Sequence, residues 1–310
     1  MKISVIGAAG VLGSCISFDI IVHKLCDELV MIDAMPDPLT GHWLDLKHAA
    51  TGSDINVVKG TYPDIVNSDI VVITAGAPVT GPIKQRSDLL PGSMPIIKDI
   101  SDKINQYCPK AIVICETNPV DPLNYELFLL SKDKDRRRFL GYSMNDSVRF
   151  RHWISEAFKV PASTVDGMVI GEHGTTQVML FSTATIKGKS VKVDEETKKK
   201  IRGEPVTFLG IMENLKPRRT AGWLSAAGTV KVIAAIKNNT GELLPCNVIQ
   251  EGEYGAKGLS MTAPCIIGKE GLRSIKKLEL AADEQEGVKN TVKAMDPLMK
   301  IIEDFVAKNK

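Results

Sequence analysis

The stretch Lys2-Ile3-Ser4-Val5-Ile6-Gly7-Ala8-Ala9-Gly10-Val11-Leu12-Gly13 decides the fold class of this chain. Its first part, Lys2 to Ile6, is a short apolar run that predicts a buried strand, and the periodicity of residues 11–23 predicts a helix after the glycines. Glycines at such a turn let the backbone approach a pyrophosphate, and the first N–H groups of the helix offer it a positive dipole end. The stretch therefore predicts a nucleotide-binding unit with contacts at Gly7, Gly10, Val11, Leu12 and Gly13.

The residue that ends the next apolar run makes this prediction more specific. Leu29 to Ile32 is typical of a second strand, and Asp33 follows it, 20 residues after Gly13. A carboxylate at this place accepts hydrogen bonds from both ribose hydroxyls of a dinucleotide and repels a 2′-phosphate. The glycine spacing is G-x-x-G-x-x-G and not the commoner G-x-G-x-x-G, and no arginine follows Asp33 directly. We therefore expect NAD as the cofactor, in preference to NADP.

Short apolar runs alternate with longer helical patterns through the first half of the chain. The further runs are Ile55 to Val58, Asp69 to Ile73 and Ala111 to Cys115. This alternation is typical of a parallel sheet wound on both faces. After about Ser143 the order of the elements changes, and the chain ends in an amphipathic helix from about Asp283 to Lys308. We expect an α/β protein with an N-terminal Rossmann domain, residues 1–143, and a C-terminal α+β substrate domain, residues 144–310.

Composition excludes several classes of partner. With 310 residues and a net charge of +2, the chain has no strongly basic body, so nucleic acid is not an expected partner. Its apolar runs are all far shorter than a membrane span, and no secretory signal pattern opens the sequence. The six cysteines form no Cys-x-x-Cys pair, so we expect no metal site. Reduced, mostly buried thiols fit a cytoplasmic location.

A histidine in a glycine-flanked turn, Gly171-Glu172-His173-Gly174, is the first candidate for chemistry. Upstream, Asp146 and Arg149 are three residues apart on a predicted helix, so both side chains can face one cavity. An acid can orient an imidazole, and a guanidinium can grip a carboxylate with two parallel hydrogen bonds. These three residues form a workable site for interconverting an alcohol and a ketone next to a carboxylate.

Taken in order, the motifs of the chain resemble those of the lactate and malate dehydrogenase family, especially its lactate-dehydrogenase-like malate dehydrogenase branch. The resemblance covers nearly the whole length. Besides the glycine loop, Asp33 and the histidine turn, it includes Thr74-Ala75-Gly76-Ala77-Pro78, Gln85-Arg86-Ser87-Asp88-Leu89, Thr117-Asn118-Pro119-Val120-Asp121 and Asp146-Ser147-Val148-Arg149-Phe150. Each motif is a weak signal alone, but all of them in this order are very specific.

The resemblance implies a role for each candidate residue. His173 would be the general acid when a 2-keto acid is reduced and the general base in the reverse direction. Asp146 would hold the second ring nitrogen, and Arg149 would clamp the C1 carboxylate. Arg86 would polarise the reacting carbonyl from a loop that can close over the substrate.

The resemblance also implies contacts at the ends of two further strands. Asn118 would contact the substrate or the nicotinamide ribose, and the bond between Asn118 and Pro119 is expected to be cis. Thr74, Ala75 and Gly76 would lie against the cofactor. The family also implies a homo-oligomer, with a tetramer favoured over a dimer.

The chain departs from the family pattern where substrate choice is set. Malate dehydrogenases place an arginine after the proline that matches Pro78, and lactate dehydrogenases usually place a glutamine there, whereas this chain has Val79. The segment up to Arg86 is also one residue longer than usual. Lys84 is our preferred candidate to bind a distal carboxylate. The alternatives are Gln85 and the pair Arg218 and Arg219.

Glu116 is a second departure, because the family usually has an apolar residue there. A buried carboxylate without a partner is costly, so we expect Glu116 to have one. Trp153 and Trp223 are expected to be packing residues.

These observations together predict an NAD-dependent dehydrogenase that acts on oxaloacetate and malate, with relaxed specificity toward pyruvate. The alternative substrate class is L-lactate or a broader set of 2-hydroxy acids. A different class, a catalytically silent protein that senses NAD, is opposed by the presence of His173, Asp146, Arg149 and Arg86 together.

Overall fold

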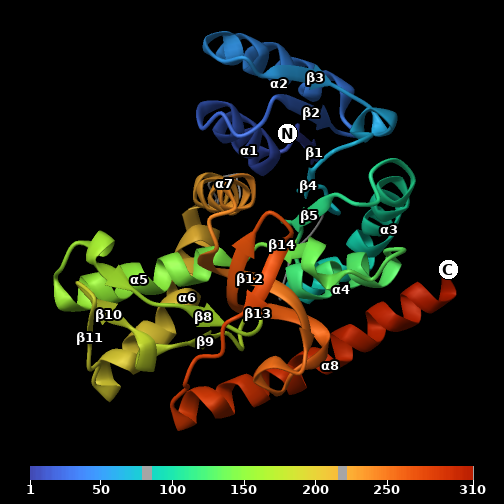
Figure 1. Cartoon of the computed structure of the whole chain (residues 1–310). Coiled ribbons are helices and arrows are strands. Elements are labelled where there is room, and N and C mark those ends of the chain that lie inside the picture. The colour runs from blue at the N-terminus through green and yellow to red at the C-terminus, as the bar shows by residue number, and fades with distance from the viewer. Residues whose placement is uncertain (79–85, 216–221, 310) are drawn as a thin grey trace.

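The structure is a computed structural model that describes residues 1–78, 86–215 and 222–309. The strands of its main sheet are β1 (Lys2–Ile6), β2 (Glu28–Ile32), β3 (Asn56–Lys59), β4 (Ile70–Ile73), β5 (Ile112–Cys115), β6 (Phe139–Gly141), β12 (Glu242–Glu251), β13 (Lys257–Gly268) and β14 (Gly271–Ile275). Within the described ranges these strands form one sheet in the order β14-β13-β12-β6-β5-β4-β1-β2-β3 (Figure 1). The six N-terminal strands pair in parallel, so their carboxyl ends meet at one edge.

Helices cover both faces of this sheet. They are α1 (Val11–Val22), α2 (Pro36–Ala49), α3 (Leu90–Tyr107), α4 (Val120–Leu130), α5 (Met144–Phe158), α6 (Glu195–Leu215), α7 (Gly222–Asn238) and α8 (Ala282–Lys308). Two small sheets complete the C-terminal half: β7 (Val165–Asp166), β10 (Thr185–Ile186) and β11 (Lys189–Ser190) form one, and β8 (Val169–Ile170) and β9 (Val178–Met179) form the other. The predicted α/β class and the doubly wound parallel sheet are confirmed.

Alternating residues of the central strands explain why both faces carry helices. Val72 of β4 faces a core that it shares with α1 and α7, whereas Val71 and Ile73 face a second core that they share with α3, α4 and α8. Each fully buried Val or Ile stabilises the fold by about 1.5–3 kcal/mol relative to an exposed one. Strands buried on both faces are therefore uniformly apolar, which is the pattern that the sequence displays.

Two long strands from the C-terminal half extend the main sheet. Strands β12 and β13 are the longest of the sheet and form an antiparallel hairpin. Asn247 of β12 lies opposite Gly141 of β6, so the hairpin continues the main sheet. The terminal helix matches its prediction, and its apolar stripe, which includes Val288, Met295 and Met299, is buried.

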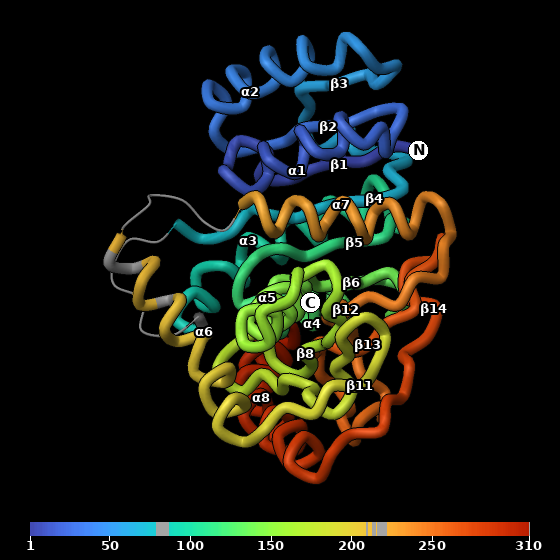
Figure 2. The backbone as a smooth tube through the Cα atoms, turned by 90° about the vertical axis from the view of Figure 1, so that its left-hand side faces the viewer, coloured from blue at the N-terminus to red at the C-terminus, as the bar shows by residue number. Residues whose placement is uncertain are grey.

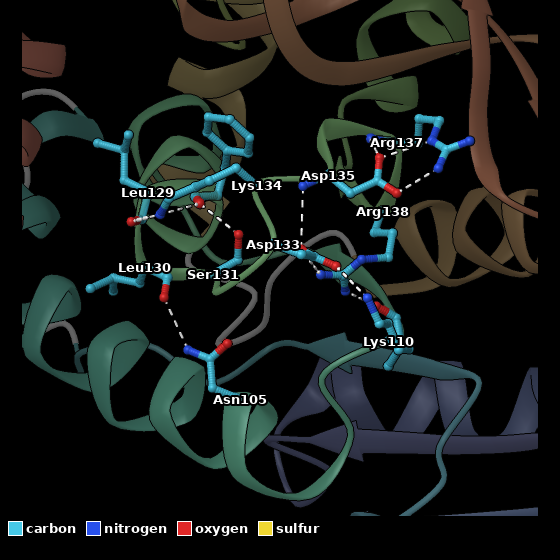
Figure 3. A network of polar contacts seen from close by, with 12 residues as sticks. Asn105, Lys110, Leu129, Leu130, Ser131, Asp133, Lys134, Asp135, Arg137 and Arg138 are labelled. Carbon is cyan, nitrogen blue, oxygen red and sulfur yellow. Dashed lines mark hydrogen bonds and ion pairs between the residues drawn. The ribbon is translucent and has the colours of Figure 1, made fainter.

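A polar network fixes β5 and β6 at the opposite edge of the sheet (Figure 3). The buried guanidinium of Arg138 donates to the carbonyl oxygen of Ala111 at 2.6 Å and to Asp133 at 2.5 Å, and Lys110 reaches Asp133 at 3.2 Å. Burial opposes ionisation of Asp133, but the hydrogen bonds from Arg138, the backbone of Asp135 and Lys110 lower its pKa to about 2. The network holds two strands whose other ends carry the candidate site.

The described residues contain neither a candidate membrane span nor a candidate metal site. Within these ranges, no helix combines the length and the apolar character that crossing a bilayer requires. Within the same ranges, no group of three or more His, Cys, Asp or Glu side chains is placed to hold a metal ion.

Candidate active site

Only glycine fits at two positions of the loop between β1 and α1, one because of its backbone conformation and one because of crowding. Gly7 has a φ of +92°, and a Cβ atom on it would lie 2.6 Å from the backbone nitrogen of Ala75. A Cβ atom on Gly13 would lie 2.2 Å from the carbonyl oxygen of Gly7. Gly10 immediately precedes α1, so the N–H groups of Val11 and Leu12 belong to the first turn of that helix. This is the geometry of an anion site at a helix N-terminus.

Asp33 lies beside this loop at the end of β2. One carboxylate oxygen accepts the backbone N–H of Ala9 at 2.9 Å, and the other accepts the backbone N–H of Met35 at 2.9 Å. The first bond ties the carboxylate to the glycine loop, and the second fixes it within its own turn. A carboxylate at the end of the second strand is where such folds bind the ribose of a dinucleotide. The residues present therefore fit a dinucleotide.

The ends of β4 and β5 are linked to the same loop. The hydroxyl of Thr74 donates to the carbonyl oxygen of Gly7 at 3.0 Å. The hydroxyl of Thr117 donates to the carbonyl oxygen of Ala75 at 2.7 Å. Gly76 has no room for a side chain, because a Cβ atom there would lie 2.7 Å from Thr117 Cγ2. Thr74, Ala75 and Gly76 are thus packed between the glycine loop and the segment that leads to Asn118.

Asn118 provides an observation that points to a ligand. The bond between Asn118 and Pro119 is cis, as expected. The side-chain oxygen of Asn118 is buried and has no hydrogen-bond partner among the residues that the structure describes. Since buried polar atoms are almost always paired, this oxygen fits a group supplied by a cofactor or a substrate.

His173 and Asp146 form a buried pair. Nδ1 of His173 lies 2.5 Å from Oδ2 of Asp146, and both residues are only 8% exposed. An ionised Asp146 can only accept, so Nδ1 carries a hydrogen in this pair and proton exchange with a substrate would use Nε2. The pair joins α5 to the turn after β8, across 27 residues of sequence.

Arg149 lies next to this pair on α5. Its Nη1 is 3.7 Å from Oδ1 of Asp146, and its guanidinium lies 4.7 Å from the centre of the Phe208 ring on α6. The predicted proximity of His173, Asp146 and Arg149 is therefore present.

Several sequence candidates cannot be placed. Arg86 begins a short 3₁₀ helix, Arg86–Leu89, but its side chain lies outside the part of the chain that the structure describes. Val79, Lys84 and Gln85 also lie outside the described residues, as do Arg218 and Arg219.

Glu116 has the partner that its burial predicts. Its Oε1 lies 2.5 Å from the hydroxyl oxygen of Thr229, and the same hydroxyl oxygen lies 2.7 Å from the carbonyl oxygen of Ser225. Burial raises the pKa of Glu116 well above its ordinary value, although the hydrogen bond with Thr229 acts in the opposite direction. The contact with Thr229 connects the end of β5 to α7.

Two residues of the site were missed by sequence reasoning. Asp121, in the first turn of α4, accepts the backbone N–H of His173 at 3.0 Å and is itself held by Asn247. The motif Thr117-Asn118-Pro119-Val120-Asp121 could have indicated Asp121 from the sequence. Phe208 had no such signal, because it lies in a helix with no recognised motif.

Two comparisons with family models cover nearly the whole chain. Residues 1–141 match the lactate/malate dehydrogenase NAD binding domain, and residues 145–308 match the lactate/malate dehydrogenase alpha/beta C-terminal domain. The chain is 33% identical over 290 residues to the malate dehydrogenase of Halobacterium salinarum. The aligned region covers 92% of this chain and 94% of that protein.

Solved structures agree with this assignment. A malate dehydrogenase from Cryptosporidium parvum superposes with a TM-score of 0.90 at 30% identity, covering 98% of this chain and 99% of the other. A lactate dehydrogenase from the same organism was solved in complex with lactic acid and nicotinamide adenine dinucleotide. It superposes with a TM-score of 0.90 at 31% identity, covering 97% of this chain and 98% of the other. The chain belongs to the lactate/malate dehydrogenase family, and its N-terminal half is the NAD binding domain of that family.

Proposed function

We propose that this protein is an NAD-dependent malate dehydrogenase that catalyses reversible hydride transfer between NADH and oxaloacetate, with pyruvate as a weaker substrate. The observation that carries the proposal is the buried pair of His173 and Asp146 with Arg149 beside it. The relative from Halobacterium salinarum bears the name malate dehydrogenase, which favours oxaloacetate over pyruvate. L-lactate or a broader set of 2-hydroxy acids remains the alternative, because Val79 replaces the usual specificity residue.

The cofactor, when bound, supplies the hydride. Protonated His173 donates its Nε2 proton to the carbonyl oxygen, which becomes the hydroxyl of the product, and it takes the proton back in the reverse reaction. Asp146 stabilises the charged imidazole and holds its orientation. Arg149 binds the C1 carboxylate, and Arg86 polarises the carbonyl as negative charge develops on its oxygen.

The residues around the glycine loop would hold the cofactor. Gly7, Gly10 and Gly13, with the N–H groups of Val11 and Leu12, would face the pyrophosphate, and Asp33 would accept the ribose hydroxyls. Thr74, Ala75, Gly76 and Asn118 would lie toward the nicotinamide end.

The test is the ratio of kcat/KM for oxaloacetate to that for pyruvate, measured by NADH oxidation. We expect oxaloacetate to be preferred, and we expect Lys84→Ala to reduce the ratio by raising KM for oxaloacetate alone. A higher efficiency with pyruvate would replace the proposal with its alternative. His173→Asn should lower kcat by about 10²- to 10⁴-fold while NADH still binds. Absence of turnover with every 2-keto acid would leave only an NAD-sensing role.

A homo-oligomer, with a tetramer favoured over a dimer, is part of the proposal. Phe18 and Val22 on α1, Leu44 on α2 and Trp223 on α7 are 48%, 53%, 47% and 68% exposed. These helices lie together on the side that faces the viewer in Figure 2. Trp223 was expected to pack internally, and that expectation is wrong for the isolated chain. Exposed apolar side chains on neighbouring helices support a contact with another copy. Light scattering of the purified protein should give four subunits, and a monomer would contradict the proposal.

We also propose a division into domains at residues 143 and 144 and a cytoplasmic location. All six cysteines are free thiols, which favours a reducing compartment.

A further inference from the structure

The guanidinium of Arg149 lies over an aromatic ring from a different helix. Its central carbon is 4.7 Å from the centre of the Phe208 ring, and the Arg149 side chain is only 19% exposed. A cation at this distance over a ring is attracted by the negative face of the ring, and the attraction grows as water is removed. The contact therefore favours one orientation of the guanidinium plane.

The packing of α6 on α5 explains why Phe208 is there. Ile201 of α6 is buried in a core with Phe150 and Ile154 of α5. Phe208 follows Ile201 by seven residues, which is close to two helical turns, so both side chains lie on the face of α6 that meets α5. Arg202 also anchors this part of α6, through an ion pair with Asp283 at 2.7 Å.

Two different contacts hold the guanidinium of Arg149. Asp146 lies 3.7 Å from Nη1, and the centre of the Phe208 ring lies 4.7 Å from the central carbon of the guanidinium. A contact between the ring and the central carbon leaves N–H groups of the guanidinium available, and a carboxylate needs two of these for parallel hydrogen bonds. An arginine that is already oriented loses less side-chain freedom when the carboxylate arrives.

We propose that Phe208 is a positioning residue that orients Arg149 for the C1 carboxylate of the substrate. This inference rests on the proposed function of Arg149. Because every 2-keto acid carries a C1 carboxylate, the contribution of Phe208 is the same for all substrates. It thus differs from Lys84, Arg218 and Arg219, the candidates for distinguishing one 2-keto acid from another.

Phe208→Leu keeps an apolar side chain and removes the ring. We expect it to raise KM for oxaloacetate and for pyruvate by the same factor, about three- to tenfold, with a small change in kcat and none in the dissociation constant of NADH. Phe208→Tyr keeps the ring, so its KM should equal that of the natural chain. Phe158→Leu, at the end of the same helix as Arg149 but away from its guanidinium, is the matched control and should leave KM unchanged.

A double-mutant cycle separates this role from a general packing role. In an Arg149→Lys background the planar cation is gone, so Phe208→Leu should change KM much less than it does in the natural chain. An equal effect in both backgrounds would overturn the proposal. An unchanged KM in Phe208→Leu, or a Phe208→Tyr variant as impaired as Phe208→Leu, would also overturn it.

Binding of oxamate, a carboxylate that is not reduced, gives a readout independent of turnover. In the presence of NADH, Phe208→Leu should weaken oxamate by the same factor as it raises KM, and Phe208→Tyr should not. If the natural chain turned over no 2-keto acid, the proposed function would fail, yet the oxamate measurement would still decide the role of Phe208. If the natural chain were active and oxamate bound equally to both proteins, only the role of Phe208 would fail.

Discussion

Glu126→Gln tests a carboxyl group that is buried in the middle of α4. The side chain is fully buried, and neither of its oxygens has a hydrogen-bond partner among the described residues. Burial raises the pKa of Glu126 to about 9, although the charge of Lys98 acts in the opposite direction. The folded chain therefore keeps a proton on Glu126 at neutral pH, because an unpaired charge in this apolar surrounding is too costly.

The sign of the pH effect follows from proton binding in the two states. The same carboxyl in the unfolded chain titrates near its ordinary value of 4.5, so between there and about pH 9 the unfolded state binds fewer protons than the folded state. Stability therefore falls as the pH rises through this window, and it levels off above pH 9. One pH unit corresponds to about 1.4 kcal/mol, so the penalty at pH 7 is about 3 kcal/mol.

Glutamine has the shape of glutamate but does not titrate. The unfolding free energy of Glu126→Gln minus that of the natural chain should therefore grow by about 4 kcal/mol as the pH rises from 5 to 8. Urea unfolding at one protein concentration, followed by circular dichroism at several pH values, measures this difference. Glu286→Gln, which changes an exposed carboxylate of α8, is the control and should give a nearly constant difference. A gap between Glu126→Gln and the natural chain that does not change with pH would refute the reasoning.

Three further changes test other parts of the molecule. Asp33→Ala should reduce the preference for NAD over NADP by about tenfold, or ~1.4 kcal/mol, in dissociation constants of the reduced cofactors; an unchanged ratio would count against the placement of Asp33 at the ribose. Asp121→Ala should lower kcat by about 10- to 100-fold at constant NADH affinity, because the backbone of His173 loses its acceptor; unaltered kcat would mean that Asp121 does not position His173. Thr229→Val should lower the unfolding free energy by about 1–3 kcal/mol, because it leaves Glu116 buried without its hydroxyl partner; a neutral effect in urea unfolding would show that another group takes over.

The features that the sequence predicted correctly are those encoded within a short stretch. The glycine loop, the strand ends at Asp33 and Thr74, and the pairing of Asp146 with Arg149 on one helix face depend on local spacing. The pairing of His173 with Asp146 joins residues 27 positions apart, so spacing does not predict it; the chemistry of the two side chains and the family resemblance indicated it.

The features that were missed depend on which helices pack together. Phe208 contacts Arg149 only because α6 lies against α5, and no periodicity in α6 specifies that neighbour. Trp223 has an apolar ring that suggests burial, but it is 68% exposed at the start of α7.

Helix α4 has no polar, solvent-facing side on which Glu126 could lie. All residues from Val120 to Leu127 are buried, because α3, α8 and the hairpin of β12 and β13 surround the helix. A helix enclosed in this way has no solvent face on which to place a charge, so a polar side chain there must pair or stay neutral. Asp121 pairs with the backbone of His173 and with Asn247, and Glu126 stays neutral. The enclosure that makes Glu126 costly also fixes the orientation of α4, and a fixed α4 is what allows Asp121 to hold His173 in place.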